Sequence, residues 1–405
     1  MTTEDIIYNV FKMREAYEES GYIVRDYYEK ELENNLRRSK NIFITGESGC
    51  GKTWLYTHVT QKKQIKHKVI NLANVKIQGG FYNYFRTQFP DIEIEEVKGK
   101  GLGINSGILA GNIISSRTIR REYDYFRMFI EENKDSLIVF DNFEIIVTDN
   151  DLLESLSCII TMADDEIMIE NNIKFLLVGA VNDILNYFSA MSNYQTIANR
   201  ISCVNIKGFN DAECDSFVTK RFSACGFQIE DQEKSLSKNI YKSTDGIPQS
   251  VNDLCYYLAL AHYEKNEQSI KVDTDTFYVG KKEWIRNYLF VEYTLVRALY
   301  LENIENAECL NYVLYAISLL KHDSFTAEKV IFNIDNHVNY RGASLSLAKI
   351  KRYLNQLSDD GNNNNILVKK NENWYSIKSY KTYICLNSVL VLQNGNISLE
   401  CENLI

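Results

Sequence analysis

The sequence predicts an α/β fold in which helices cover both faces of a parallel sheet, followed by a helical region and a smaller unit of helices and strands. Three changes of pattern support this prediction. Short apolar runs alternate with amphipathic stretches from residue 41 to residue 206, as expected for buried strands between helices. Helical spacing then dominates from Asp211 to Asn306, with no convincing strand run. After Asn306 the pattern is again helical and then ends in short strands.

The first region contains five candidate strands with helices between them. The strands are expected at Asn41–Thr45, Lys68–Asn71, Ser136–Phe140, Ile173–Val178 and Cys203–Ile206. The helices are expected near residues 51–62, 79–89, 118–133, 151–170 and 181–189. Strands that alternate with helices in this way indicate a parallel sheet, because parallel neighbours need a crossover connection.

The domain boundaries are expected where these patterns change. They divide the chain into an N-terminal helical segment, an α/β core, a helical region with connecting helices, and a C-terminal domain, at 1–38, 39–208, 209–306 and 307–405. A glycine-rich stretch at 91–117 interrupts the core. It lacks the Gly-Lys-Ser/Thr ending of a phosphate-binding loop, so we expect a flexible insertion or irregular hairpin. A loop that grips a ligand or partner is the alternative.

The composition restricts the class of protein. The 405 residues are 45% hydrophobic and 24% charged, which is typical of a folded chain. The net charge of −9 argues against a surface that is basic all over, so any contact with nucleic acid must be local. The nine scattered cysteines include no CxxC pair, and no signal peptide or apolar run of about 20 residues is present. We therefore expect a cytoplasmic protein with reduced thiols and no membrane partner.

One motif predicts chemistry directly. A complete GxxxxGKT sequence follows an apolar strand and opens a helix, which is the context of a P-loop. Its residues are Gly46, Glu47, Ser48, Gly49, Cys50, Gly51, Lys52 and Thr53. In such a loop the backbone N–H groups and the helix N-terminus surround the phosphates. Lys52 would reach the β- and γ-phosphates and Thr53 would bind Mg²⁺, so ATP and Mg²⁺ are the expected cofactors.

A second motif predicts the rest of the catalytic site. The apolar strand Leu137–Phe140 ends in Asp141, the pattern of a Walker B carboxylate that binds Mg²⁺. Glu144 is the candidate general base, since a carboxylate there would polarise the attacking water. Asn142, however, stands where a glutamate usually follows the aspartate. The alternative is that Glu144 is an exposed glutamate at the start of a helix.

Together with further signatures, these motifs resemble the AAA+ ATPases of the initiator and STAND branch, which include origin-recognition and signal-transduction ATPases. The resemblance covers roughly residues 20–265. Besides the two Walker motifs it has four signatures, which are an entry motif similar to FVGRE, a sensor 1 strand, an arginine-finger position and the GxP of a helical lid. They lie at Tyr22–Asp26, Phe175–Ala180, Asn199-Arg200 and Gly246-Ile247-Pro248.

The resemblance implies roles for further residues. Ile23, Val24 and Pro248 would lie near the adenine base, and Arg200 would act as a finger on a neighbouring subunit of a homo-oligomer. A surface arginine that caps a helix end is the alternative for Arg200. The sequence departs from the family where Ala180, or else Asn182, takes the place of sensor 1.

The sensor 2 arginine is also absent, because Gln249 stands in its place. Both departures favour slow hydrolysis that depends on assembly, since an arginine finger can raise the rate by orders of magnitude.

The C-terminal domain resembles a winged helix. Helices are expected at Leu310–Leu320, Phe325–Asn333 and Ser344–Ser358, and a hairpin at Ile366–Lys369 with Trp374–Ile377. Residues 321–388 contain ten basic and six acidic side chains, in contrast to the acidic whole. The candidate DNA-binding residues are Lys349, Lys351, Arg352, Lys369 and Lys370. The alternative is that this domain packs on its own ATPase core or on a partner protein.

The sequence thus predicts an ATP-dependent molecular switch that couples its nucleotide state to self-assembly and to engagement of DNA, as in initiation, transposition or defence against mobile DNA. The alternative is a STAND-like regulatory ATPase whose C-terminal domain binds protein and whose output is a partner effector. A nucleotide kinase is a third, disfavoured hypothesis, because the chain has a GxP lid motif and no evident site for an acceptor substrate.

Overall fold

The computed structural model divides into two compact units, Ala16–Lys207 and Met1–Glu15 together with Gly208–Ile405. It describes residues 2–12, 17–38, 40–90, 124–181, 184–230, 235–265, 269–271, 274–300, 307–320, 324–338, 345–359, 361 and 365–401. The glycine-rich stretch expected as an insertion at 91–117 lies outside these residues, as does Asn182. No helix in the described part of the chain has the length and apolar composition needed to span a bilayer.

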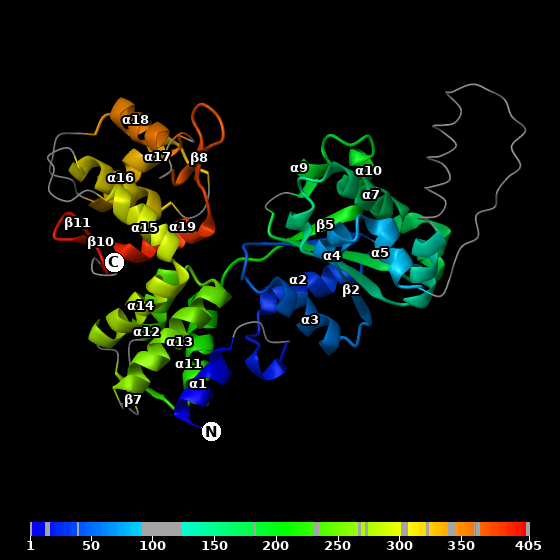
Figure 1. Cartoon of the computed structure of the whole chain (residues 1–405), viewed down its shortest axis with the longest axis horizontal. Helices are drawn as coiled ribbons and strands as arrows, with labels where there is room; N and C mark the ends of the chain where they lie inside the picture. Colours follow the sequence, from blue (N-terminus) through cyan, green and yellow to red (C-terminus); the bar gives the residue numbers. More distant parts are fainter. Residues whose placement is uncertain are drawn as a thin grey trace, which may run out of the picture. The chain divides into compact units, whose positions relative to one another are not determined.

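The first unit, called the core unit here, is built on a five-stranded parallel sheet (Figure 1). Its strands are β1 (Asn41–Thr45), β2 (His67–Asn71), β3 (Leu137–Asp141), β4 (Lys174–Gly179) and β5 (Ile201–Asn205). Their order in the sheet is β2-β3-β4-β1-β5, and all neighbours are parallel. This confirms the predicted α/β class and, within a residue or two, all five predicted strands.

Both faces of the sheet are buried. Phe43 and Phe140 belong to a large apolar cluster with residues of the helices on one face. Ile42 and Val139, their neighbours in sequence, are fully buried outside that cluster, and alternation places them on the other face. The helices of this unit are α2 (Asp26–Leu36), α3 (Lys52–Lys62), α4 (Leu72–Ile77), α5 (Phe81–Thr87), residues 124–132, α7 (Asn150–Thr161), α8 (Glu166–Glu170), α9 (Ile184–Phe188) and α10 (Tyr194–Arg200), with 3-10 turns at η1 (Glu19–Gly21), η2 (Phe143–Ile145) and η3 (Met162–Asp164).

One helix prediction in this unit was wrong in detail, and two helices, α4 and α10, were not predicted. The helix expected over 151–170 is interrupted, because Asp165 has extended backbone (φ −69°, ψ 149°) between η3 and α8. The helix α4 was missed; it begins directly after β2, where the Asn71 side chain accepts a hydrogen bond from the N–H of Ala73. Gly79 and Gly80 then have positive φ, so the next helix begins at Phe81.

The second unit begins with a helical bundle. Its elements are α1 (Thr3–Phe11), α11 (Asp211–Ala224), β6 (Gln228–Glu230), α12 (Ser235–Thr244), α13 (Pro248–Glu264), β7 (Ser269–Lys271), α14 (Thr274–Tyr288) and α15 (Phe290–Leu299). Arg221 and Asn252 donate side-chain hydrogen bonds to the carbonyls of Val10 and Phe11, so α1 is tied to α11 and α13. The N-terminal segment expected at 1–38 is therefore divided between the two units.

The expectation that this region lacks strands was wrong. The strands β6 and β7 form a short parallel pair, in which Ile229 lies opposite Ile270. Each strand has three residues, which is too short to give a period-two signal in the sequence.

The C-terminal part of this unit contains α16 (Ala307–Ser318), α17 (Ala327–Asn333), a π-helical turn η4 (Ile334–Val338), α18 (Leu347–Leu357), β8 (Leu367–Lys369), β9 (Tyr375–Ile377), α19 (Tyr380–Val389), β10 (Leu390–Gln393) and β11 (Asn396–Leu399). The predicted order of three helices and a hairpin is confirmed, with β8 and β9 antiparallel. The helix α19 and the second hairpin, β10–β11, were not predicted.

Candidate nucleotide-binding site

The P-loop connects the end of β1 to the start of α3. Gly49 and Gly51 have positive φ (79° and 93°), a conformation that glycine adopts at little cost. Gly46 also has a positive φ, and a side chain there would collide with the carbonyl oxygen of Ile206 and approach the Cys50 sulfur to 2.8 Å. The loop therefore needs its glycines, and its shape brings the N-terminus of α3 to the carboxyl edge of the sheet.

Lys52 lies at the centre of this loop. Its Nζ donates hydrogen bonds to the carbonyl oxygens of Gly46 (2.9 Å) and Glu47 (3.0 Å). Thr53, the next residue on α3, is exposed. The ammonium and the hydroxyl thus lie at adjacent positions where the helix begins, as expected for a loop that binds phosphates and Mg²⁺.

Asp141 ends β3, which is separated from β1 by β4. Its Oδ1 accepts a hydrogen bond from the N–H of Asn142 (2.8 Å), a residue in the left-handed conformation (φ 63°). Burial raises the pKa of the Asp141 carboxyl, and the charge of Glu144 raises it further, while the Asn142 N–H and the charge of Lys52 act in the opposite direction.

Tyr56 is a site residue that sequence analysis missed. Its side chain is 2% exposed, and this burial, together with the interaction of its hydroxyl with the Asp141 carboxylate, raises the pKa of the tyrosine. The signal was present, because Tyr56 follows Lys52 by four residues and so lies on the same face of α3.

Glu144 belongs to the turn η2 that follows Asp141. Its Oε2 accepts a hydrogen bond from the N–H of Ala180, just after β4 (2.9 Å). Gly179 makes room for this contact, because a side chain there would lie 2.8 Å from the Cβ of Phe143. The end of the expected sensor 1 strand therefore provides a backbone N–H that orients Glu144, at the same sheet edge as Lys52 and Asp141.

The entry motif lies against the P-loop and its helix. Ile23 is buried and Val24 is 57% exposed. The guanidinium of Arg25, buried at 3% exposure, donates to the carbonyl oxygens of Cys50 and Lys207. The ring of Tyr22 stacks on His58 of α3 at 4.1 Å between centroids.

Arg200 ends α10 and is paired within its own chain. Its Nε and Nη2 lie 2.8 Å and 2.7 Å from Oδ2 of Asp164, whose side chain is 67% exposed. Such surface ion pairs contribute only about 0–1 kcal/mol. The structure thus pairs Arg200 with a carboxylate of its own chain, and the Arg200 side chain is itself only 26% exposed.

The remaining predicted residues belong to the second unit. Pro248 is in the first turn of α13, with Ile247 as its N-cap. On α18, Lys349 and Arg352 are exposed, and Lys351 lies 3.8 Å from Glu328. In the β8–β9 hairpin Lys369 and Lys370 are both exposed, and Lys369 donates to the Asn355 side chain (3.0 Å).

The carboxylates of the core unit fit the ion that a P-loop requires. Within the described ranges, no group of three or more His, Cys, Asp or Glu side chains could hold a metal by itself. Mg²⁺ is usually bound by one or two protein oxygens together with phosphate oxygens. Thr53 and Asp141 supply such oxygens, and burial, together with the charge of Glu144, raises the pKa of Asp141, so a cation there would favour its ionised form.

The sheet and the loop at its edge define the class: this is the fold of an α/β P-loop ATPase. The chain is similar in structure to the Walker-type ATPase PABY2304 of Pyrococcus abyssi, with 13% identity, a TM-score of 0.50, and coverage of 93% of this chain and 99% of that one. At this identity the likeness is one of fold.

Two further solved structures are similar at lower TM-scores. They are the Aeropyrum pernix ORC2 protein in ADPNP-ADP complexes (13% identity, TM-score 0.47, 94% and 96% of the two chains) and the Aeropyrum pernix ORC1 protein in complex with DNA (12%, 0.45, 93% and 94%). No protein-family model and no curated protein sequence matches the chain.

Proposed function

We propose that this chain is an AAA+ ATPase that binds ATP with Mg²⁺ at the P-loop and hydrolyses it. The observation that carries the proposal is the meeting of Lys52, Asp141 and Glu144 at one edge of the parallel sheet. After β1 the chain crosses to β2 at one edge of the sheet, whereas β5 lies beside β1 in the opposite direction. Ligands of open α/β sheets bind at such a switch point, outside the carboxyl ends of the strands.

Each residue has a distinct task in this proposal. Lys52 binds the β- and γ-phosphates, while Thr53 and Asp141 hold Mg²⁺, which when bound would neutralise charge that develops on the phosphates. The hydrogen bond from Ala180 engages Oε2 of Glu144. Oε1 is then the oxygen that accepts a proton from the attacking water.

Binding of ATP to the variant Lys52→Ala tests this proposal. We expect the variant to lose high-affinity binding, because it lacks the ammonium that the P-loop places at the phosphates. Titration calorimetry with ATP and Mg²⁺ measures the loss. Lys63→Ala is the matched control, since Lys63 follows the same helix and pairs with Glu33. Equal ATP affinity in Lys52→Ala and the control would overturn the assignment of the site.

We further infer that the nucleotide state controls self-assembly and engagement of DNA. The order of three helices and a hairpin supports a winged helix, in which α18 and the β8–β9 hairpin approach the duplex. Lys349, Arg352 and Lys370 are exposed on these elements. Trp374, next to the hairpin turn, is 46% exposed, and its ring adds an apolar contact to this basic surface.

A STAND-like regulatory ATPase is the second candidate. It is favoured by the contacts of Lys351 with Glu328 and of Lys369 with Asn355, which engage two of the five candidate cations inside their own domain. In this case the C-terminal domain binds a partner protein, and hydrolysis resets the switch. Binding to duplex DNA separates the two candidates, because only the first predicts an affinity that falls steeply with salt.

A further inference from the structure

One buried side chain connects the P-loop to the last residue of the core unit. Arg25 Nη1 donates to the carbonyl oxygen of Cys50, in the P-loop, at 3.0 Å. Its Nη2 donates to the carbonyl oxygen of Lys207 at 2.6 Å. The guanidinium also lies over the ring of Tyr28, 4.6 Å from the centroid. A planar group with several donors can bridge two carbonyls in this way, whereas a lysine ammonium is a single point charge.

A residue in the first turn of α2 makes a second contact with Lys207. The N–H of Lys207 donates to the hydroxyl of Tyr28 at 3.1 Å. Both backbone polar groups of Lys207 are thus bound by residues at the start of α2. Lys207 ends the core unit, and Gly208 begins the longer segment of the second unit.

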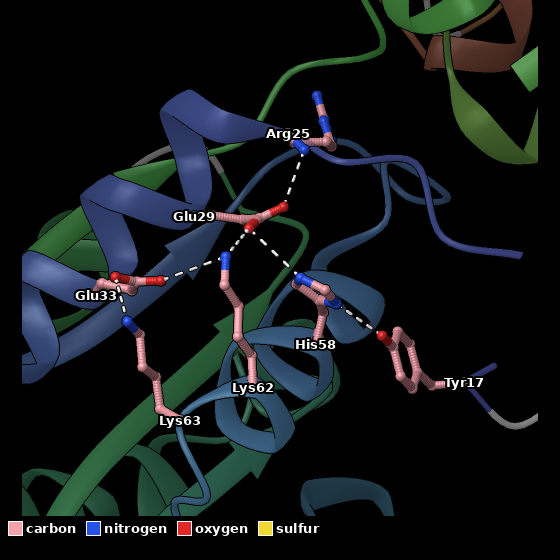
Figure 2. A network of polar contacts seen from close by, with 7 residues as sticks. All are labelled: Tyr17, Arg25, Glu29, Glu33, His58, Lys62 and Lys63. Atoms are coloured by element: carbon pink, nitrogen blue, oxygen red, sulfur yellow. Dashed lines mark hydrogen bonds and ion pairs between the residues drawn. The ribbon is translucent and has the colours of Figure 1, made fainter. Parts of the chain in front are cut away.

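The backbone of Arg25 is anchored to the helix that carries Lys52 (Figure 2). The Arg25 N–H donates to Oε1 of Glu29 at 3.0 Å, and Glu29 is 2% exposed. The other oxygen, Oε2, accepts from Lys62 Nζ (2.9 Å) and lies 3.4 Å from His58 Nε2. Lys62 and His58 both belong to α3. Because these contacts fix Arg25 at its backbone, a movement of the P-loop acts on its guanidinium.

Within the second unit, the residues after Lys207 are held by the turn that leads into α13. The N–H of Phe209 donates to the carbonyl oxygen of Gly246 at 2.7 Å. A side chain at position 208 would lie 2.7 Å from the Asp245 oxygen and 2.9 Å from that of Gly246, so only glycine permits this approach. The turn continues into Ile247 and Pro248.

We propose that Arg25 is a positioning residue that transmits the state of the P-loop to the Lys207–Gly208 linker and from there to the turn before α13. The inference rests on the proposed binding of nucleotide at the P-loop. When phosphates draw the P-loop N–H groups inward, the Cys50 carbonyl moves with them. The Arg25 guanidinium, which is bound to the carbonyls of both Cys50 and Lys207, must then move with the Cys50 carbonyl or lose a buried, charge-assisted hydrogen bond. Losing such a bond is costly.

Hydrogen exchange with and without saturating ATP and Mg²⁺ tests the inference. In the wild-type chain we expect nucleotide to slow exchange at residues 46–53 and to change it at residues 206–209. In Arg25→Lys, which keeps the charge but not the bridge, residues 46–53 should still be protected, while the change at 206–209 should be about tenfold smaller. Arg127→Gln is the control, since Arg127 is an exposed arginine paired with Glu131 in the same unit.

Tyr28→Phe keeps the inference testable if Arg25→Lys fails to fold. It removes only the hydrogen bond to Lys207 and retains the ring beneath Arg25, so we expect a smaller response at 206–209 with full protection of residues 46–53. A wild-type P-loop that nucleotide does not protect would overturn the proposed function itself. If nucleotide protects the P-loop of the wild-type chain but exchange at residues 206–209 does not change, the inference alone is overturned. It is also overturned if Tyr28→Phe, and Arg25→Lys where it folds, show as large a change at 206–209 as the wild type.

Discussion

The Asp141 carboxyl lies in surroundings that disfavour its ionised form. Burial is the main reason that its pKa is raised, and Glu144 adds a second negative charge nearby. The Asn142 N–H and the Tyr56 hydroxyl stabilise the ionised form only in part. A divalent cation would remove this conflict, and that is the physical reason to expect the nucleotide to bind together with Mg²⁺.

Substitutions of Asp141 and Glu144 should affect different steps, ATP binding and ATP hydrolysis. Asp141→Asn should weaken the Mg²⁺-dependent part of ATP binding. Glu144→Gln should leave ATP bound and slow hydrolysis about 100-fold or more, because it removes the general base. Glutamine is a matched replacement, since its amide oxygen can still accept from Ala180. Equilibrium binding and single-turnover rates separate the two effects, and a wild-type rate in Glu144→Gln would place the base elsewhere.

Among the helices, α13 carries a buried ionisable group. Asp253 is 5% exposed, and burial raises the pKa of its carboxyl to about 7, against the opposing effects of Lys381 and Asn252. An ordinary aspartate in the unfolded chain has a pKa near 3.8. The folded state therefore holds this proton over a pH range in which the unfolded state has released it.

Asp253 should make the second unit less stable as the pH rises. The stabilisation is fully present below the unfolded pKa, is lost as the pH approaches the folded pKa of about 7, and amounts to roughly 4 kcal/mol over that range. Urea unfolding at pH 4.5 and 7.5 measures it. Asp253→Asn should remove the trend and be more stable than wild type at pH 7.5, whereas Asp359→Asn, at an exposed position, should behave as wild type. An unchanged pH trend in Asp253→Asn would contradict the assignment.

The elements that could be predicted are those whose burial leaves a pattern in the sequence. The strands β1, β3 and β4 lie between two layers of helices, so they appear as continuous apolar runs. The three-residue strands β6 and β7 have no such pattern, and α4 depends on a local cap by Asn71. The break before α8 depends on the backbone of one residue, Asp165.

For the molecule as a whole, the sequence predicted the P-loop but not the contacts that organise it. The GxxxxGKT motif is local, so its residues can be assigned from spacing alone. Arg25 bridges residues far away in the sequence, Cys50 and Lys207. Likewise, the pairing of Arg200 with Asp164 depends on how η3 and α10 pack, which periodicity does not specify.

If the active form is an oligomer in which Arg200 reaches a neighbouring site, defects in two subunits should complement each other. Arg200→Ala and Lys52→Ala should each be inactive alone, and a mixture should regain part of the ATPase rate, because each subunit supplies what the other lacks. The specific activity should also rise with protein concentration. Activity that is independent of concentration, with no complementation, would contradict assembly.

The basic surface of the C-terminal part makes a separate prediction. Removing Lys349 and Arg352 together should weaken duplex binding for all sequences and lower the slope of log affinity against log salt by about 0.9 for each lost phosphate contact. Lys220→Ala, an exposed change on α11, is the control. A wild-type chain that binds no duplex at low salt in the presence of ATP and Mg²⁺ would favour the regulatory ATPase.

The buried thiol inside the P-loop has a consequence for the chemistry of the chain. Cys50 is fully buried beneath Gly46, and burial raises its pKa. Because alkylating and oxidising reagents attack the thiolate, this sulfur is protected both by its surroundings and by its proton. Cys158 and Cys203 are exposed in the same unit. Oxidants will therefore modify those two first, and Cys50 becomes reactive only when the loop around it opens.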